Sequence, residues 1–358
     1  MKVKQVIKAI LFVIIFLFLL QSVTYMLRTN GNIKEIFVGF YAEPEDTVDV
    51  ILIGSSPVYP YYIAPQIWGE YGIACYPLSS NQQRPRAATY LVEEALKTQT
   101  PELFVFEMRQ YIYPESTMME NMAFTRGATD NLKYSWNRFA MINDMVPEVS
   151  ERYTYYFDIF KYHSNWKTII LPDQYTAFSY ERLHPLKGYT VNTTVVPSEG
   201  KDRSEITEVM EIPEEQEEQL YRLLDYVKEN ELNALFIVSP MKLASEEQMK
   251  FNYIKSIVES YGYDFVNFND YYEEIGIDFA TDFYDDGTHT NTLGAEKCTA
   301  FFGAYLDQNY EFEDKRDDER YETWNAAYKY WQTCREEALQ AINDKIVREE
   351  YGEIEVAE

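Results

Sequence analysis

The 358-residue sequence has few cysteines, few histidines and a marked shortage of basic residues. Its three cysteines, Cys75, Cys298 and Cys334, are too scattered for a disulfide framework and do not form the C-x-x-C pairs of a zinc site, so we expect buried free thiols. The 32 Lys and Arg residues are outnumbered by 59 Asp and Glu residues, which gives a net charge of −27. Because basic side chains supply most of the affinity for phosphate backbones, nucleic acid is not an expected partner.

Cofactor-binding motifs are also missing. The sequence contains no Walker loop, no G-x-G-x-x-G turn and no metal-ligand spacing, so we expect neither a cofactor nor a metal. Aromatic residues, by contrast, are abundant, with 32 Tyr, 21 Phe and 5 Trp, and 46% of all residues are hydrophobic. A chain of this composition buries enough apolar surface to offset the entropy cost of folding, so we predict a packed globular protein.

Residues 1–28 have the character of a membrane anchor. Three lysines, at positions 2, 4 and 8, precede an apolar run from Ala9 to Leu27. This run is close to the roughly 20 helical residues that cross a hydrocarbon core of about 30 Å. Basic residues on its N-terminal side favour a cytoplasmic N-terminus, so we expect a single-pass anchor with the rest of the chain outside the membrane. A cleaved signal peptide and a buried core helix are the alternatives.

The rest of the sequence alternates between short apolar runs and amphipathic segments. Runs such as VDVILI are typical of strands buried on both faces of a parallel sheet, and they alternate with apolar residues at helical spacing. We predict a three-layer α/β fold with about five parallel strands. The expected strands are residues 48–53, 73–78, 103–108, 234–238 and 264–268, and the expected helices are residues 62–71, 86–97, 214–230, 246–261 and 315–350.

Composition also suggests how the chain is divided. Residues 29–45 are polar and are expected to form a stalk, and residues 46–312 form the α/β domain. Residues 110–207, rich in Tyr, Trp and Met, interrupt that domain as a helical and irregular insertion over the sheet. Residues 313–358 form an acidic, helical C-terminal tail whose aromatic residues pack on the domain or on a partner.

Two short sequences after predicted strands carry groups suited to nucleophilic catalysis. Gly54-Ser55-Ser56 directly follows the first strand, and a serine in a strand-to-helix turn is held out of the sheet edge beside its own backbone N–H. After the last strand, Asp286 precedes His289 by three residues, a spacing at which a carboxylate can accept the imidazole Nδ1–H. Parallel strands bring these two loops to one edge of the sheet, where ligands bind in such folds.

Together these two blocks resemble the SGNH/GDSL hydrolase superfamily, which implies a flavodoxin-like sheet and a Ser-His-Asp triad. The resemblance makes Ser56 the nucleophile, His289 the base and Asp286 the orienting carboxylate, with Ser55 where aspartate is usual. The GSS sequence is similar to that of a membrane-anchored branch that modifies teichoic acids or works with membrane-bound O-acyltransferases.

The resemblance is weaker at the oxyanion hole. The superfamily supplies a glycine N–H after the second strand and an asparagine side chain after the third. Here the candidates for the oxyanion hole are Ser79, Ser80 and Asn81 after the second strand and Arg109 after the third. Loss of one such donor lowers the rate by roughly 10² to 10³.

Four further residues are candidates for binding substrate. His163, Asn165 and Trp166 lie in the insertion beside a group of aromatic residues, a setting that can hold a sugar or an acyl donor. A hydrogen-bonded core histidine is the alternative for His163. Asn291, just after His289, resembles the corresponding part of the membrane-anchored branch.

The function expected from these features is that of an extracytoplasmic serine esterase or O-acyltransferase. Its substrate would be an acylated glycan or another cell-surface or cell-wall polymer, and the N-terminal helix would hold it in the lipid bilayer. The alternative is a protein that kept the fold but lost catalysis, and that serves as a scaffold or binding partner of a membrane acyltransferase.

Overall fold

A five-stranded parallel sheet forms the centre of the protein in a computed structural model that describes residues 3–28, 31–167 and 180–352. The strand order is β2-β1-β3-β4-β5, which is the order of flavodoxin-like folds. The predicted α/β class and all five predicted strands are therefore confirmed. The strands are β1 (Val50–Gly54), β2 (Cys75–Ser79), β3 (Leu103–Glu107), β4 (Ala234–Val238) and β5 (Asp264–Asn267).

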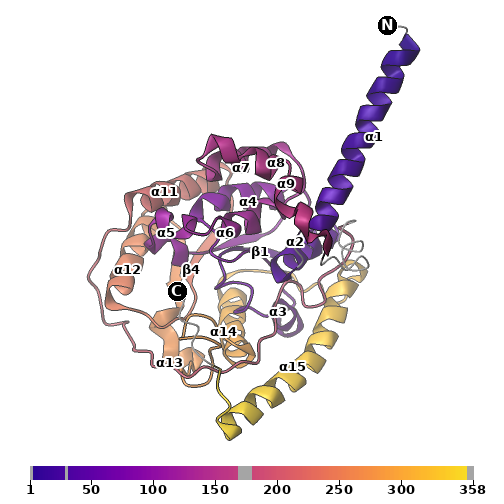
Figure 1. The fold of residues 1–358 in the computed structure, drawn as a ribbon. Coiled ribbons are helices and arrows are strands. Elements are labelled where there is room, and N and C mark those ends of the chain that lie inside the picture. The colour runs from indigo at the N-terminus through magenta and orange to yellow at the C-terminus, as the bar shows by residue number, and fades with distance from the viewer. Residues whose placement is uncertain (1–2, 29–30, 168–179, 353–358) are drawn as a thin grey trace.

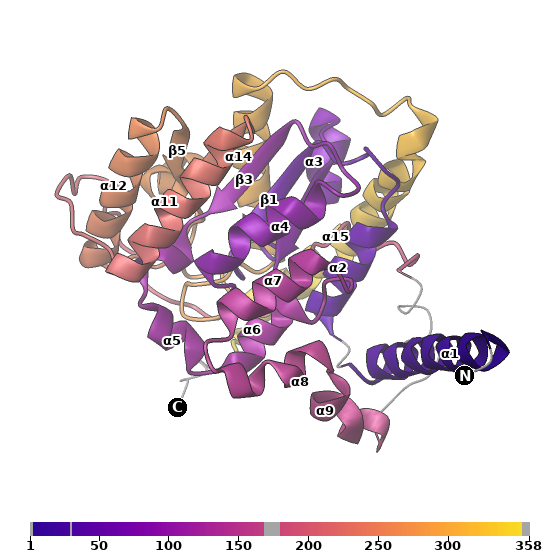
Figure 2. The same cartoon turned by 90° about the horizontal axis from the view of Figure 1, so that it is seen from above.

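The sheet is buried because helices cover both of its faces. On one face lie α4 (Ala88–Ala95), α11 (Glu214–Glu229) and α12 (Ser245–Ser260), and on the other lie α3 (Ala64–Tyr71) and α14 (Thr292–Asn309), as Figures 1 and 2 show. A short helix, α13 (Tyr272–Ile275), follows β5. The central strands β1 and β3 are almost wholly apolar, as a double-faced parallel sheet requires.

The register of the sheet places the turn that contains Ser56 beside the loop that carries the first oxyanion candidates, Ser79 to Asn81. Val50 of β1 pairs with Cys75 of β2, so the last residues of these strands, Gly54 and Ser79, lie side by side at the carboxyl edge. The turn that contains Ser56 and the loop that follows Ser79 therefore start at neighbouring points.

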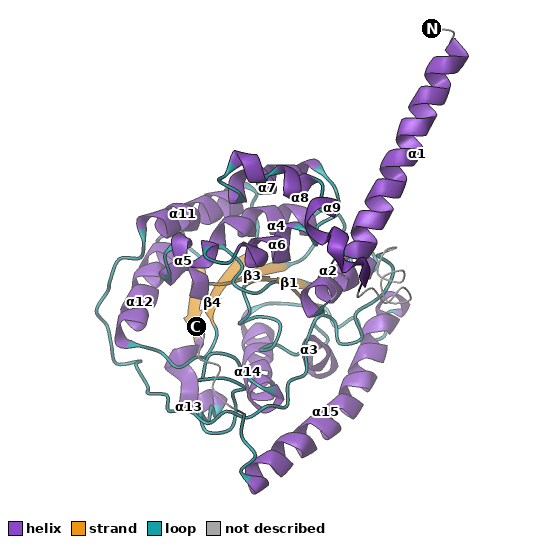
Figure 3. Ribbon diagram, viewed as in Figure 1, coloured by secondary structure: helices purple, strands orange, loops and turns teal. Residues whose placement is uncertain are grey.

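The C-terminal helix α15 (Glu322–Arg348) packs back on the domain along α3, as Figure 3 shows from the side. Trp324 and Trp331 on this helix are fully buried, and Tyr321, just before it, stacks on Trp68 of α3 with a centroid distance of 5.3 Å. The predicted packing of the tail on the domain is confirmed. Residues 353–358 of the predicted tail lie outside the described residues.

The N-terminal helix α1 (Val3–Leu27) extends away from the domain (Figure 1). It is long and apolar enough to cross a membrane, and its residues 3–19 are exposed. Only its last turn contacts the domain, where Thr24, Tyr25 and Leu27 are buried.

The predicted polar stalk is wrong. Residues 29–30 lie outside the described residues, and α2 (Asn32–Ala42) follows them as a helix that packs on β2. Ile36, Phe37 and Phe40 are fully buried, and the Tyr76 hydroxyl on β2 donates a hydrogen bond to the carbonyl of Ile36. The apolar residues of this segment fall at helical spacing, so α2 belongs to the core of the domain.

The insertion has two parts. Its first part is a group of short helices that packs on α4, mainly through α7, and not directly on the sheet. Its second part, residues 180–213, is mostly irregular. It runs past the loop between α13 and α14, where Val196 N–H donates to the carbonyl of Phe283. Residues 168–179 lie outside the described residues. The helices are α5 (Glu115–Met119), α6 (Met122–Thr129), α7 (Trp136–Met145), α8 (Tyr153–Tyr156) and α9 (Ile159–Tyr162).

Candidate active site

A serine, a histidine and an aspartate form a hydrogen-bonded chain at the carboxyl edge of the sheet. Ser56 Oγ lies 2.6 Å from His289 Nε2, and His289 Nδ1 lies 2.5 Å from Asp285 Oδ2. Ser56 comes from the turn after β1, and the other two residues come from the loop between α13 and α14. The structure therefore brings Ser56 and His289 together, although 233 positions separate them in the sequence.

The prediction of Asp286 as the orienting carboxylate is wrong. The Asp286 side chain is nearly half exposed and forms an ion pair with Lys242 at 2.8 Å. Asp285 takes its place because the loop turns back on itself here. Its Oδ1 accepts the backbone N–H groups of Thr288 and His289, at 2.8 and 2.9 Å. The left-handed backbone at Gly287, with φ of 76°, allows this tight turn.

These contacts also set the charge of Asp285. Burial raises its pKa, but hydrogen bonds from His289 and from the Thr288 hydroxyl and N–H outweigh burial and bring the pKa to about 2. A carboxylate that stays ionised can fix the His289 tautomer and stabilise an imidazolium.

The turn after β1 leaves no room for a side chain at Gly54. A Cβ atom there would lie 2.6 Å from Cβ of Glu107 and 2.8 Å from Cγ2 of Val58. Glycine at this position therefore lets β1 and β3 approach closely just before the nucleophile. This requirement explains the glycine of the Gly54-Ser55-Ser56 sequence by packing alone.

The loop that carries His289 is supported from below by two side chains. Arg109 Nη1 donates to the carbonyl oxygen of Thr288 at 2.6 Å, and the Tyr61 hydroxyl lies 2.7 Å from the same oxygen. Tyr284 stacks on the imidazole ring of His289, with an interplanar angle of 11°. The imidazole is thus held through its neighbour in the chain and through its ring face.

Arg109 differs in this respect from the oxyanion donor that we predicted. Its guanidinium is buried, and its two Nη groups donate to Thr288 and to Tyr61. The structure thus gives Arg109 a positioning role under the catalytic loop. The Arg109 Nε has no partner among the described residues.

The other oxyanion candidates differ in their surroundings. Ser79 and Ser80 are fully buried, and the Ser80 hydroxyl donates to Gln83 at 3.1 Å. Asn81 is exposed, and its amide oxygen accepts a hydrogen bond from the Tyr59 hydroxyl at 2.6 Å. With its oxygen engaged in this way, the Asn81 amide presents its NH₂ end as the donor for a ligand.

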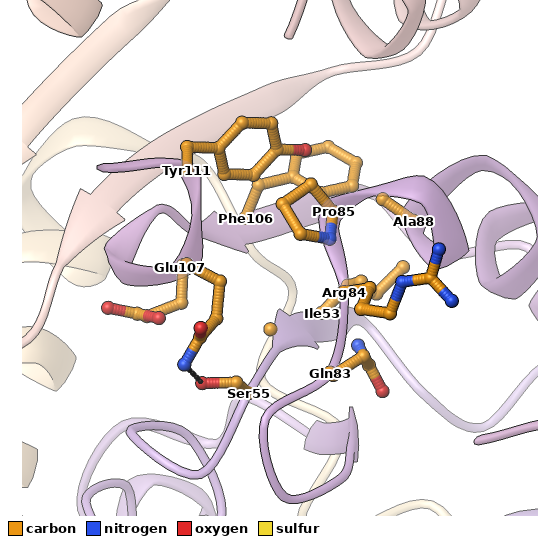
Figure 4. A pocket seen from close by; sticks show the side chains of 11 residues that line it. Ile53, Ser55, Gln83, Arg84, Pro85, Ala88, Phe106, Glu107 and Tyr111 are labelled. Atoms are coloured by element: carbon orange, nitrogen blue, oxygen red, sulfur yellow. Dashed lines mark hydrogen bonds between the residues drawn. The ribbon is translucent and has the colours of Figure 1, made fainter. Parts of the chain in front are cut away.

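A small cavity lies behind the nucleophile turn (Figure 4). Its volume is about 10 Å³, enough for about one water molecule and too small for a substrate. Gln110 Nε2 donates to Ser55 Oγ at its edge, at 3.1 Å. Burial raises the pKa of Glu107, which also lines the cavity, to about 7, although Arg109 lowers it. Sequence reasoning did not single out Glu107, and its position as the last residue of β3 is the only signal for it.

The predicted substrate-binding residues do not gather at the triad. The prediction for Asn291 is wrong, because its side chain is fully buried and caps α14 by accepting the N–H groups of Leu293 and Gly294. His163, Asn165 and Trp166 lie in the turn after α9, and none of them lines the cavity described next.

A cavity of about 430 Å³ lies between the loop after β2 and the end of α1, and none of the triad residues Ser56, His289 and Asp285 lines it. Tyr59 and Asn81 line its inner end, and Arg28, Lys34 and Arg126 line the rest. Tyr59 is near enough to the Tyr284 ring on His289 to add to the effect of burial in raising the pKa of Tyr284. Burial and the charge of Arg28 together lower the pKa of Lys34 to about 8.

Within residues 3–28, 31–167 and 180–352, no group of three or more His, Cys, Asp or Glu side chains is placed to hold a metal. The chain matches no protein-family model and no curated protein. It is similar to the crystal structure of a "putative acylhydrolase" from Bacteroides fragilis, with 10% sequence identity and a TM-score of 0.37. The matched region covers 74% of this chain and 90% of the other. A similarity this distant assigns no activity, so any functional proposal depends on the side-chain geometry.

Proposed function

We propose that this protein is a serine esterase or O-acyltransferase of the SGNH type, anchored in the membrane by α1 with its α/β domain outside the cytoplasm. The observation that carries the proposal is the chain from Ser56 to His289 to Asp285, with heavy-atom distances of 2.6 and 2.5 Å. Each member has the partner that its role requires: a base for the nucleophile and an ionised carboxylate for the base.

In the proposed reaction, Ser56 Oγ attacks the carbonyl carbon of an acyl ester while His289 Nε2 takes the hydroxyl proton. The imidazolium is stabilised by Asp285 and then gives the proton to the leaving alkoxide, which leaves an acyl-enzyme. Attack by water on this ester completes hydrolysis, and attack by a sugar or polyol hydroxyl completes transfer. His289 acts as the base in either second step.

Stabilisation of the oxyanion is assigned to two donors. The backbone N–H of Ser56 lies in the turn itself, and the Asn81 amide NH₂ follows the neighbouring strand β2. A pair of donors of this kind is the usual arrangement in acyl transfer, and loss of one lowers the rate by roughly 10² to 10³.

The substrate is proposed to be an acylated glycan or cell-wall polymer at the membrane surface. The cavity that starts at Tyr59 and Asn81 ends at Arg28, the residue directly after the apolar helix α1. A substrate that enters by this route would therefore approach Ser56 from the side of the domain on which α1 leaves it.

Labelling of the full-length protein with a fluorophosphonate tests the catalytic proposal. A single adduct on Ser56, lost in His289→Ala and absent in Ser56→Ala, is the expected result. Ser55→Ala is the matched control, since its hydroxyl is turned to Gln110 and should be dispensable for labelling. Failure of Ser56 to react in a folded protein would contradict the proposal and favour a non-catalytic scaffold for a membrane acyltransferase.

The scaffold remains a second candidate for one specific reason. The side chain after β3 that replaces the asparagine of the SGNH superfamily is Arg109, and its Nη groups are occupied within the protein. If Asn81 and Ser56 N–H do not suffice as donors, the triad would be present without effective turnover.

A further inference from the structure

Six aromatic side chains on the helical part of the insertion are exposed to solvent. Their exposed fractions lie between 45% and 85%. We call them the aromatic patch: Trp136, Phe139, Tyr153, Phe157, Phe160 and Trp166. Large exposed apolar patches are uncommon on soluble proteins, and they mark sites of contact with a protein or a membrane.

The tryptophans show the contrast most sharply. Trp136 is 85% exposed and Trp166 is 64% exposed, whereas Trp68, Trp324 and Trp331 are fully buried. These five are all the tryptophans in the chain. Both exposed tryptophans therefore belong to the patch, and the domain core holds the others.

The patch is fixed to the foot of α1. The Asn165 side chain donates to the carbonyl of Leu27 at 3.0 Å, one residue before Trp166. Arg28 pairs with Asp158 between α8 and α9, and Arg138 of α7 contacts the same carboxylate at 3.1 Å. These contacts are buried, so the patch and the end of α1 keep a fixed distance. Figures 1 and 2 both show α8 and α9 beside the base of α1.

The charge of the chain is divided in a way that suits a membrane surface. Residues 199–358 contain 40 acidic and 15 basic residues, whereas residues 1–198 contain 19 acidic and 17 basic residues. Almost all of the net charge of −27 is therefore on the half of the chain that does not include α1 and the patch. Lys161 and Lys167 are exposed within the patch region, and Lys167 lies 5.9 Å from the ring of Trp166.

We propose that the aromatic patch is immersed in the interfacial layer of the bilayer that α1 spans, so that the insertion is a second membrane contact. Tryptophan and tyrosine favour the head-group level, and phenylalanine favours the acyl boundary just below it. An open hollow of about 690 Å³ between Trp136, Phe139 and Phe157 offers space for lipid. The proposal rests on the insertion of α1 into a membrane and is independent of catalysis.

Such a contact would fix the orientation of the domain. With α1 alone in the membrane, the domain could tilt about the end of that helix. A second contact through the aromatic patch would hold the domain at one angle to the membrane. The 430 Å³ cavity, which Arg28 and Lys34 line at the end of α1, would then lie on the side of the head groups.

Tryptophan quenching in nanodiscs tests the proposal with the full-length chain. Phospholipids brominated on the acyl chain quench only indole rings at the membrane, and α1 contains no tryptophan. We expect brominated lipid to lower the emission relative to unbrominated lipid. The difference should fall in Trp136→Phe and in Trp166→Phe and vanish in the double variant. Trp324→Phe, which removes a buried ring, is the matched control and should retain it.

Whether the protein elutes together with the nanodiscs reports separately on the insertion of α1 into the bilayer. Equal emission in the two lipids, with the protein still in the nanodisc, would overturn the proposal while leaving the anchor intact. Strong quenching by acrylamide in that case would show that the patch faces water or awaits a protein partner. Absence of the protein from the nanodiscs would overturn both the anchor and the patch contact, and fluorophosphonate labelling of Ser56 would remain valid.

Discussion

Two regions of this protein place polar and aromatic groups in opposite ways. One is the edge of the sheet at Ser56 and His289, which we call the catalytic edge after its proposed role. The other is the layer that we propose to lie against the membrane, and we call it the membrane-side layer. At the catalytic edge, aromatic rings such as Tyr61 are buried and the reactive polar groups, Ser56 and His289, remain partly exposed. In the layer formed by the end of α1 and by α6–α9, cations such as Arg28 and Arg138 are buried and aromatic rings are exposed. The catalytic edge exposes reactive polar groups, and the membrane-side layer exposes aromatic side chains.

The difference shows what each region must keep fixed. Ser56 and His289 need an exact mutual distance, and buried rings and backbone hydrogen bonds supply it. The membrane-side layer needs its helices joined while its outer face stays apolar, and buried ion pairs such as Arg28–Asp158 join them. A buried pair contributes little net stability, but removal of one partner is costly, so such pairs specify an arrangement.

The largest expected effect separates the two neighbouring carboxylates of the catalytic loop. Asp285→Asn should lower kcat for a p-nitrophenyl ester by about 10³- to 10⁴-fold, because the imidazole loses the carboxylate that fixes its tautomer. Asp286→Asn should change kcat by less than about twofold, because its exposed pair with Lys242 is worth little. Steady-state kinetics on both variants measures the contrast.

Equal effects of the two substitutions would show that the loop rearranges in solution. A large loss for Asp286 alone would restore the spacing expected from the sequence. Both variants should keep the thermal midpoint of the wild type within a few degrees, which separates loss of catalysis from loss of folding.

The next effect breaks the membrane-side layer. Asp158→Asn leaves Arg28 and Arg138 without the buried carboxylate that they share, and we expect a cost of about 3 to 5 kcal/mol in local stability. Hydrogen exchange of the α7–α9 amides should accelerate while that of the strands stays slow. Glu151→Gln, at an exposed position on the same layer, is the control and should leave exchange unchanged. Uniformly faster exchange over the whole domain would contradict the division into two regions.

Much of the catalytic edge could be predicted from the sequence. The strands are short apolar runs in a regular alternation, so periodicity was enough to predict them. Ser56 and His289 were selected by the Gly54-Ser55-Ser56 turn, by the Asp-x-x-His spacing, and by the resemblance of these two blocks to the SGNH/GDSL superfamily. The sequence could not decide between Asp285 and Asp286, because that choice depends on how the loop closes. The left-handed Gly287 lets the N–H groups of Thr288 and His289 reach the first aspartate.

Two other predictions failed for different physical reasons. Residues 29–45 were read as a polar stalk, but tertiary packing against β2 buries the apolar face of residues 32–42 as α2, together with Lys34, while Glu35 stays exposed. Asn291 was taken as a ligand-binding group because of its place after His289, whereas its local role as an N-cap needs only its backbone neighbours. Long-range packing against β2 decides the first case, and a single sequence does not display it.

A pH effect is expected where the two regions meet, at His184 behind α2. Its Nδ1 accepts the N–H groups of Leu186 and Gly188, so the ring is held neutral, and burial lowers its pKa from 6.5 to about 4. The unfolded chain binds a proton below pH 6.5 and the folded protein does not until about pH 4. Stability should therefore fall by about 3 kcal/mol as the pH drops through this window.

Measurement of the thermal midpoint at pH 7 and pH 4.5, in the wild type and in His184→Asn, isolates this contribution. An asparagine oxygen can accept the same N–H groups but does not titrate in this range. The thermal midpoint of the wild type should therefore fall more than that of the variant when the pH is lowered from 7 to 4.5. A constant difference at the two pH values would show that His184 is not the group responsible.

The smallest effect concerns the support beneath the catalytic loop. Arg109→Lys keeps a positive charge but cannot hold the Thr288 carbonyl and the Tyr61 hydroxyl with one planar group. We expect kcat to fall by about 10- to 100-fold through a small displacement of His289, with KM nearly unchanged. The rate of fluorophosphonate labelling should fall in parallel, because it depends on the same displaced base. Arg222→Lys, which alters a partly exposed contact with Asp144, is the control.

The division of the loss between kcat and KM decides the role of Arg109. A positioning residue acts on Ser56 and His289 before any substrate arrives, so its loss slows labelling by a small probe as much as it slows turnover. A substrate-binding cation would instead raise KM when replaced, and probe labelling would change little. The buried contacts of Arg109 with the loop that carries His289 favour a parallel loss of turnover and labelling. Hydrogen bonds of this kind hold the catalytic edge in place, whereas buried ion pairs hold the membrane-side layer.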